Sequence, residues 1–312
     1  MAVIVWNHTI LVKALLIVWF RTILARVGLD AGIDVVDTMI WFPTAPEVPK
    51  YGMLQSALGQ HRSDPSSSPV SYLFQDGPVL PDGQDPIDYT LGQMAKFGIG
   101  RAVVDVDLDP SGELAVKRHP ERFIASCSVD PNQGMAAVRR IQALHDELGL
   151  RAVSLAPSML NPQVPIDDRR MYPVYAKCVE LDLPVFITVG VPGPRVPMAA
   201  QRVELLDEVC WFFPELRIVM RHGAQPWEDL AVKLMLKWPN LSYSTSAFAP
   251  RRYPQAIIDF ANKRGKDKVM FAGYFAIGLT WDRIFEELRQ VPLADEVWPL
   301  FLRDNAVRVL GL

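Results

Sequence analysis

The chain has 312 residues, half of them hydrophobic, and a formal net charge of −3 at pH 7. This length can bury one large core or two modest domains. The pI is near 6.0, which gives no sign of the basic surface that a nucleic acid needs. We therefore expect no DNA- or RNA-binding function. The three cysteines lie in separate apolar segments without CxxC spacing, which predicts a reduced, cytoplasmic protein rather than a disulfide scaffold.

The first segment of the chain, residues 3–29, is strongly apolar but is interrupted by Lys13, Arg21 and Arg26. A membrane-spanning helix needs about 20 consecutive apolar residues, and these charges recur too often for that. We therefore expect an N-terminal apolar helical extension, residues 1–31, ahead of a domain at 32–312. Residues 3–29 then contact a partner protein, the interpretation we favour, or attach peripherally to a membrane surface. A start codon assigned too early would also explain residues 1–31.

From residue 32 onward, short apolar runs alternate with amphipathic segments. The runs predict strands at Gly32–Phe42, Ala102–Val106, Phe123–Val129, Ala152–Leu155, Pro184–Val189, Ile218–His222, Leu241–Ser246 and Val269–Ala272. The intervening segments predict helices at Tyr89–Phe97 (opened by Asp85-Pro86), Gly112–Arg118, Gly134–Leu148, Met171–Leu181, Gln201–Phe212, Pro226–Lys237, Pro254–Lys263 and Trp281–Arg289. Such alternation indicates parallel strands with crossover helices, and eight units predict an α/β fold, a single (β/α)8 TIM barrel.

A long connection, residues 43–84, is rich in Pro, Ser, Gly and Asp. Loops of this length usually have a function, and we expect this one to be a mobile cover over a site. No GxGxxG motif follows a strand and no GxxxxGK[ST] motif is present. The sequence therefore gives no support to nucleotide binding.

The predicted strand Ile218–His222 delivers a cation and an imidazole, Arg221 and His222, to its C-terminal end. In a TIM barrel this end carries the active site. We predict His222 as the catalytic acid–base group, because neutral imidazole is available near pH 7, and Asp37 as the group that orients it. The expected substrate-binding residues follow other strands or belong to nearby loops: Trp41, Thr188, Arg195, Arg221, Arg251, Arg252 and Tyr274.

Four stretches together carry a resemblance to a known family: Gly92–Val104, His119–Pro131, Ile218–Trp227 and Asp304–Leu312. They resemble the amidohydrolase superfamily, in the branch that contains aminocarboxymuconate-semialdehyde decarboxylase. The likeness covers residues 33–312. It implies a TIM barrel and hydrolase or decarboxylase chemistry, and it does not name a substrate.

The chain departs from this family where the family binds its metal. The family's first strand ends in Asp-x-His-x-His, and here Met39 and Trp41 stand at the two histidine positions. Thr188 replaces the histidine of the fifth strand, and Tyr274 stands where the eighth strand usually supplies an aspartate. An indole offers no lone pair and a thioether is a soft ligand. The resemblance therefore predicts a barrel without a catalytic metal or other cofactor.

Two classes of function remain open. The first is a metal-independent hydrolase or lyase that uses His-based acid–base chemistry on a small carboxylated or lactone-like substrate, since arginine binds carboxylates bidentately. The second is a non-catalytic homologue that acts as a subunit or binding partner of a related enzyme. Retention of His222 and of the long loop favours the enzyme, whereas the apolar extension favours the partner role. In either case we expect a homo- or hetero-oligomer.

Overall fold

The structure is a computed structural model that describes residues 35–44, 57–61, 69–74 and 77–312. The predictions for the extension 1–31 and for the start of the first strand lie outside these residues. Among the described residues, no helix is long and apolar enough to cross a membrane.

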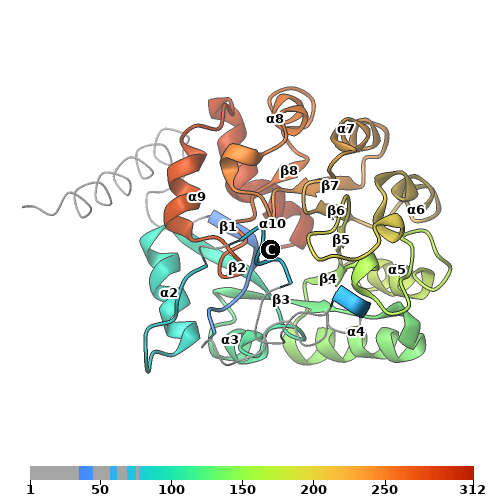
Figure 1. Cartoon of the computed structure of the whole chain (residues 1–312). Coiled ribbons are helices and arrows are strands. Elements are labelled where there is room, and N and C mark those ends of the chain that lie inside the picture. Colours follow the sequence, from blue (N-terminus) through green and yellow to red (C-terminus); the bar gives the residue numbers. More distant parts are fainter. Residues whose placement is uncertain (1–34, 45–56, 62–68, 75–76) are drawn as a thin grey trace, which may run out of the picture.

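Eight parallel strands follow one another around a ring in sequence order (Figure 1). They are β1 Val35–Ile40, β2 Ile99–Asp105, β3 Phe123–Ser128, β4 Ala152–Leu155, β5 Val185–Thr188, β6 Ile218–Arg221, β7 Leu241–Ser244 and β8 Val269–Met270. The ring is closed between β1 and the segment after β8, because Thr38 N–H donates to Phe271 O at 3.2 Å and Trp41 N–H to Phe275 O at 3.0 Å. The predicted TIM barrel is thus confirmed.

Helices α2 to α9 surround this ring, and α10 lies across one end of it (Figure 1). They are α2 Pro86–Lys96, α3 Gly112–Arg118, α4 Met135–Leu148, α5 Tyr172–Glu180, α6 Leu206–Phe212, α7 Glu228–Lys237, α8 Gln255–Ala261, α9 Trp281–Leu288 and α10 Asn305–Leu310. Short 3-10 turns and one π-helical turn at Leu300–Asp304 complete the connections.

Several predicted boundaries differ from the structure by one or two residues, and two differ by three or more. Strand β2 begins at Ile99, three residues before the predicted start, because Gly98 turns the chain at φ 66° and Arg122 donates to the carbonyls of Ile99 and Gly100. The predicted helix at 201–212 is α-helical only from Leu206, since Arg202 is extended at φ −69° and ψ 141° and separates two 3-10 turns that precede the α-helix. Both differences depend on backbone conformations that apolar periodicity does not encode.

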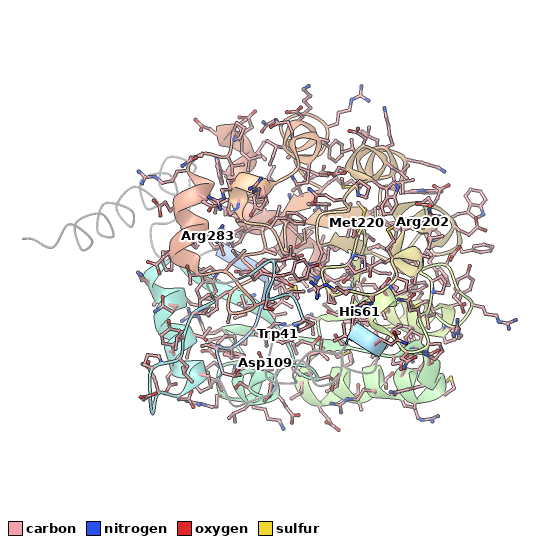
Figure 2. All side chains as sticks on the ribbon, viewed as in Figure 1. Trp41, His61, Asp109, Arg202, Met220 and Arg283 are labelled. Carbon is pink, nitrogen blue, oxygen red and sulfur yellow. The ribbon has the colours of Figure 1, made fainter. Side chains whose placement is uncertain are left out.

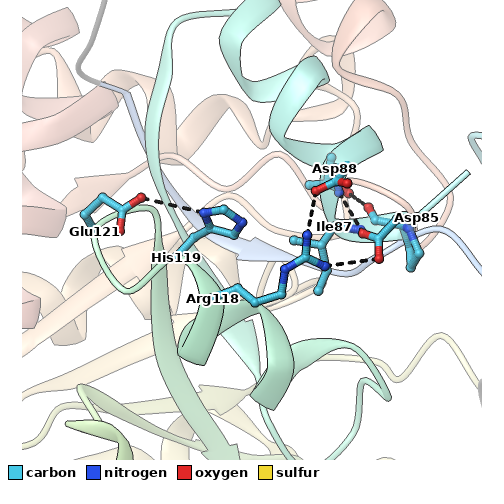
Figure 3. Close-up of polar contacts among 8 residues, drawn as sticks. Asp85, Ile87, Asp88, Arg118, His119 and Glu121 are labelled. Carbon is cyan, nitrogen blue, oxygen red and sulfur yellow. Dashed lines mark hydrogen bonds and ion pairs between the residues drawn. The ribbon is translucent and has the colours of Figure 1, made fainter.

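Surface polar contacts join neighbouring helices on the β1–β3 side of the barrel (Figure 3). Asp85 caps α2 by accepting from the backbone N–H groups of Ile87 and Asp88 at 2.8 and 2.9 Å. Arg118, at the end of α3, donates to the carboxylates of Asp85 and Asp88 at 3.1 and 2.9 Å. The next residue, His119, lies 3.8 Å from the carboxylate of Glu121, and this contact stays within the connection between α3 and β3.

The interior of the barrel changes from apolar to polar within two residues along its strands. A lower layer packs against α10 residues Ala306, Val309 and Leu310, and consists of Val36, Val103, Ile124, Ala152, Phe186, Val219 and Met270. Alternate residues of a strand face the same side. The next inward-facing layer is therefore Thr38, Asp105, Ser126, Ser154, Thr188, Arg221 and Ser244. The side chains that β1 to β7 contribute to this second layer are all polar, whereas Ala272, two residues beyond Met270 of β8, is apolar. Five of the polar side chains form the base of a cavity.

Candidate active site at the barrel mouth

A cavity of about 700 Å³ opens above this polar layer. Five residues of the layer line its floor: Asp105, Ser126, Ser154, Thr188 and Arg221. Its walls are largely apolar and include Met39, Trp41, Leu155, Met159, Phe248 and Tyr274. Part of the predicted covering loop also lines it, through Pro69, Val70, Tyr72, Leu73 and Phe74. This volume is typical of a small-molecule site, and its position at the C-terminal ends of the strands is where TIM-barrel enzymes bind substrate.

Arg221 is a buried cation in the cavity floor. Its side chain donates to Ser154 Oγ at 2.9 Å and to Thr38 O at 3.2 Å, and its guanidinium lies 4.5 Å above the Phe186 ring. Its Nε is buried without a hydrogen-bond partner among the described residues. Burial lowers the pKa of Arg221 to about 10, and the charge of Asp105 opposes that shift. The group stays cationic at neutral pH.

His222 lines the cavity next to Arg221. Burial and the neighbouring Arg221 charge lower the pKa of His222 to about 3, so the ring is neutral at pH 7. Its backbone N–H donates to Ser246 Oγ at 3.2 Å, and the same hydroxyl lies 3.0 Å from Nδ1. The Ser246 hydroxyl can accept from the backbone N–H and donate its own hydrogen to Nδ1, an arrangement that goes with the neutral tautomer whose ring hydrogen is on Nε2. His222 thus offers a neutral N–H donor and is a weak base.

Asp105 is the carboxyl group of the cavity. Its Oδ1 accepts from the backbone N–H groups of Asp107 and Leu108 at 3.0 and 2.8 Å, and its Oδ2 from Ser128 Oγ at 2.7 Å. Burial raises the pKa of Asp105 to about 6, although these hydrogen bonds oppose the rise. A carboxyl group with a pKa near physiological pH is suited to proton transfer. Sequence reasoning placed Asp105 at a strand end and did not select it as a site residue.

Asp37, the predicted partner of His222, lies elsewhere. Its carboxylate is fully buried, does not line the cavity, and has no hydrogen bond to His222. Instead Oδ1 accepts from the backbone N–H groups of Met39 and Gly273 at 3.1 and 2.8 Å, and Oδ2 accepts from Trp281 Nε1 at 2.9 Å. Because its contacts join β1 to the segment after β8 and to α9, the structure corrects the predicted orienting role and points to a structural one.

The four residues that the sequence resemblance sets against the family's ligand positions all line this one cavity: Met39, Trp41, Thr188 and Tyr274 (Trp41 is labelled in Figure 2). The Tyr274 ring contacts the His222 ring edge to face, with centroids 5.4 Å apart. The described residues contain no group of three His, Cys, Asp or Glu side chains that could hold a metal ion. Catalytic zinc needs three such ligands, so the donor set at this mouth does not fit the metal of the family.

The predicted arginines divide into two groups. Arg251 and Arg252 line the cavity at its rim, together with Arg283 of α9, which the sequence did not suggest (Figure 2). Arg195 does not line the cavity; its guanidinium lies 5.0 Å from the ring of Tyr72, whose hydroxyl donates to Gly193 O. Arg195 therefore packs on the outside of the covering segment.

Residues with strained backbone conformations cluster around the opening of the cavity. Among the described residues, those other than glycine that have positive φ are Asp182, His222, Ala224, Ala247, Tyr274 and Ala276. All except Asp182 follow β6, β7 or β8, and His222, Ala247 and Tyr274 line the cavity. Such conformations cost about 1–3 kcal/mol each and concentrate at functional sites, where the surrounding fold holds them.

Comparison with known proteins identifies the family. A family model described as Amidohydrolase matches residues 73–312. The chain belongs to the amidohydrolase family. No curated protein matches the chain.

Solved structures with the same fold include an uncharacterised TIM-barrel protein from Bordetella bronchiseptica, with 22% identity, a TM-score of 0.66, and coverage of 89% of this chain and 98% of that one. The 5-carboxyvanillate decarboxylase of Sphingomonas paucimobilis has 15% identity and a TM-score of 0.61, covering 90% and 99%. A 5-carboxyvanillate decarboxylase of Novosphingobium aromaticivorans, complexed with manganese and 4-hydroxy-3-methoxy-5-nitrobenzoic acid, has 16% identity and a TM-score of 0.62, covering 90% and 97%. At these identities the likeness concerns the fold.

Proposed function

We propose that this amidohydrolase-family chain is a hydrolase or lyase that acts on a small carboxylated or lactone-like molecule by proton transfer, without a metal held by protein side chains. The observation that carries the proposal is a cavity floor that combines a carboxyl group of raised pKa, a neutral imidazole and a buried cation, namely Asp105, His222 and Arg221. The decarboxylase names of two structural relatives support a carboxylated substrate class.

Each of these groups has a role that follows from its protonation state. Asp105 is ionised above about pH 6 and accepts a proton from water or substrate. His222 is too weak a base for that step, so its N–H donates to the substrate carbonyl or carboxylate, in a revision of the acid–base role that the sequence suggested. Arg221 stabilises the negative charge that develops above the floor.

A panel of aromatic carboxylates and lactones, assayed for carbon dioxide and acid release, tests the proposal. Asp105→Asn should lower kcat by about 10²-fold or more, and His222→Asn by a similar factor with little change in KM. Asp88→Asn is the matched control, because Asp88 of α2 pairs with Arg118 at 2.9 Å and does not line the cavity.

The pH profile provides a second readout. Activity of the wild type should rise with pH through an inflection near the Asp105 pKa of about 6, because the ionised form is the base. Asp105→Asn should remove that inflection. Saturable binding of panel compounds without any turnover would instead establish the non-catalytic alternative.

A further inference from the structure

Three arginines stand together at one side of the cavity rim, in the connections that follow β7 and β8. Arg251 and Arg252 belong to the 3-10 turn Pro250–Arg252, and Arg283 lies in the first turn of α9. All three line the cavity. Segments after strands seven and eight are a frequent oxyanion-binding region of TIM barrels.

The rim carries more positive than negative charge. Glu287 accepts from Arg283 Nε at 2.9 Å and lies 3.5 Å from Arg251 Nε, with its side chain only 12% exposed. No side-chain hydrogen bond or ion pair joins Arg252 to another of the described residues. Among the ion pairs of the described residues, Glu287 is shared by Arg251 and Arg283, and Arg252 adds a positive charge with no carboxylate paired to it there.

The cation of the floor is less available to a ligand than those of the rim. Arg221 already donates to Ser154 and Thr38, packs on Phe186, and has its Nε buried. Between floor and rim the walls are apolar and aromatic, and include Trp41 and Tyr274. The lining of the cavity is therefore polar at the base, apolar in the middle and cationic at the opening.

From this order we propose that the rim arginines Arg251, Arg252 and Arg283 form a separate oxyanion site, which holds a carboxylate or phosphate of the ligand away from the reacting group. The ligand is an anion with an apolar, aromatic-sized body, and it enters with its uncharged reactive end toward Asp105 and His222. Only this orientation rests on the proposed function; the anion site itself does not. The bond that reacts then lies at the end of the ligand near Asp105 and His222. It is not the bond that joins the rim-bound carboxylate to the rest of the ligand.

Binding of unreactive probes tests the site without any turnover. We suggest fluorescence titrations with 2-naphthol, 2-naphthoate and 2-naphthyl phosphate, which share one body and differ in charge. The wild type should bind the two anions more tightly than the neutral probe, and high salt should reduce that preference. Whichever anion binds more tightly distinguishes a carboxylate ligand from a phosphate ligand.

Arg252→Gln is the decisive variant, because Arg252 is exposed and its loss should not affect folding. It should weaken binding of the better anion by about 10-fold and leave 2-naphthol binding unchanged. Arg264→Gln is the matched control, since Arg264 is an exposed arginine between α8 and β8, at the opposite end of the barrel. Equal binding of all three probes, no binding of any of them, or equal effects of the two variants would overturn the proposal. Loss of turnover with anion binding intact would count only against the proposed reaction.

Discussion

The buried carboxylate of Asp37 allows the structural role of this residue to be tested quantitatively. In Asp37→Asn, the amide oxygen can keep the contacts of Oδ1 with the Met39 and Gly273 N–H groups, but the amide nitrogen then faces Trp281 Nε1, which is also a donor. The variant loses one hydrogen bond and buries donors without partners, each costing about 1–3 kcal/mol. At pH 5.5 we expect a loss of about 2–4 kcal/mol in the free energy of unfolding.

The loss of stability in Asp37→Asn should become smaller as the pH rises. Burial raises the pKa of folded Asp37 to about 7 from the ordinary aspartate value of 3.8, so between these values the folded protein binds more protons than the unfolded chain. The contribution of Asp37 to stability is therefore complete below about pH 3.8, is already partly lost at pH 5.5, and is lost completely as the pH rises through about 7. The variant lacks this titration, so its deficit should shrink by about 2 kcal/mol between pH 5.5 and pH 8.5.

Urea unfolding of both proteins at the two pH values measures these quantities. Asp82→Asn is the control, because Asp82 is exposed and makes no described side-chain hydrogen bond. A deficit that is equal at both pH values, or below about 0.5 kcal/mol at pH 5.5, would refute the reasoning. Activity per folded molecule separates structure from catalysis, since a structural Asp37 leaves it unchanged whereas a catalytic one does not.

Three further predictions concern the mouth and the N-terminal segment. Gly223→Ala should lower the free energy of unfolding by about 1–3 kcal/mol, because φ is +90° and a Cβ would lie 2.2 Å from the Phe248 ring, whereas Gly92→Ala, with nothing within 4 Å, should not destabilise. Elemental analysis of protein purified without chelators should find no stoichiometric zinc, manganese or iron, and one tightly held ion per chain would contradict this. Removal of residues 1–31 should change the oligomeric state measured by light scattering; a full-length protein released only by detergent, with a truncated form of unchanged size, would instead indicate membrane attachment.

The sequence predicted the architecture because each strand and helix leaves a local pattern of apolar residues. It also placed several residues correctly at the cavity, among them Arg221, His222 and Tyr274. In each case the position at the end of a strand was sufficient, since strand ends meet at one side of a parallel barrel.

The choice between the two buried aspartates could not be made in this way. Asp37 and Asp105 each end the same tripeptide, Val-Val-Asp. In β1 the inward-facing residues are Val36 and Thr38, so Asp37 points away from the cavity, whereas in β2 Val103 and Asp105 both face inward. A shift of one residue reverses the side that a strand residue faces, and tertiary pairing sets it. Arg195 was misplaced for a related reason, because its contact with Tyr72 joins two loops distant in sequence.

The packing of α10 against the lower layer of the barrel has a kinetic consequence. Because Ala306, Val309 and Leu310 fill that end with apolar side chains, substrate entry and product exit have to use the same opening at the mouth. Val70 and Phe74 stand over this opening, and Phe74 contacts Tyr274 with ring centroids 5.6 Å apart. Product that has not left blocks the next substrate, so release past the covering segment is a step that can limit turnover, and slower diffusion in viscous buffer would then reduce kcat.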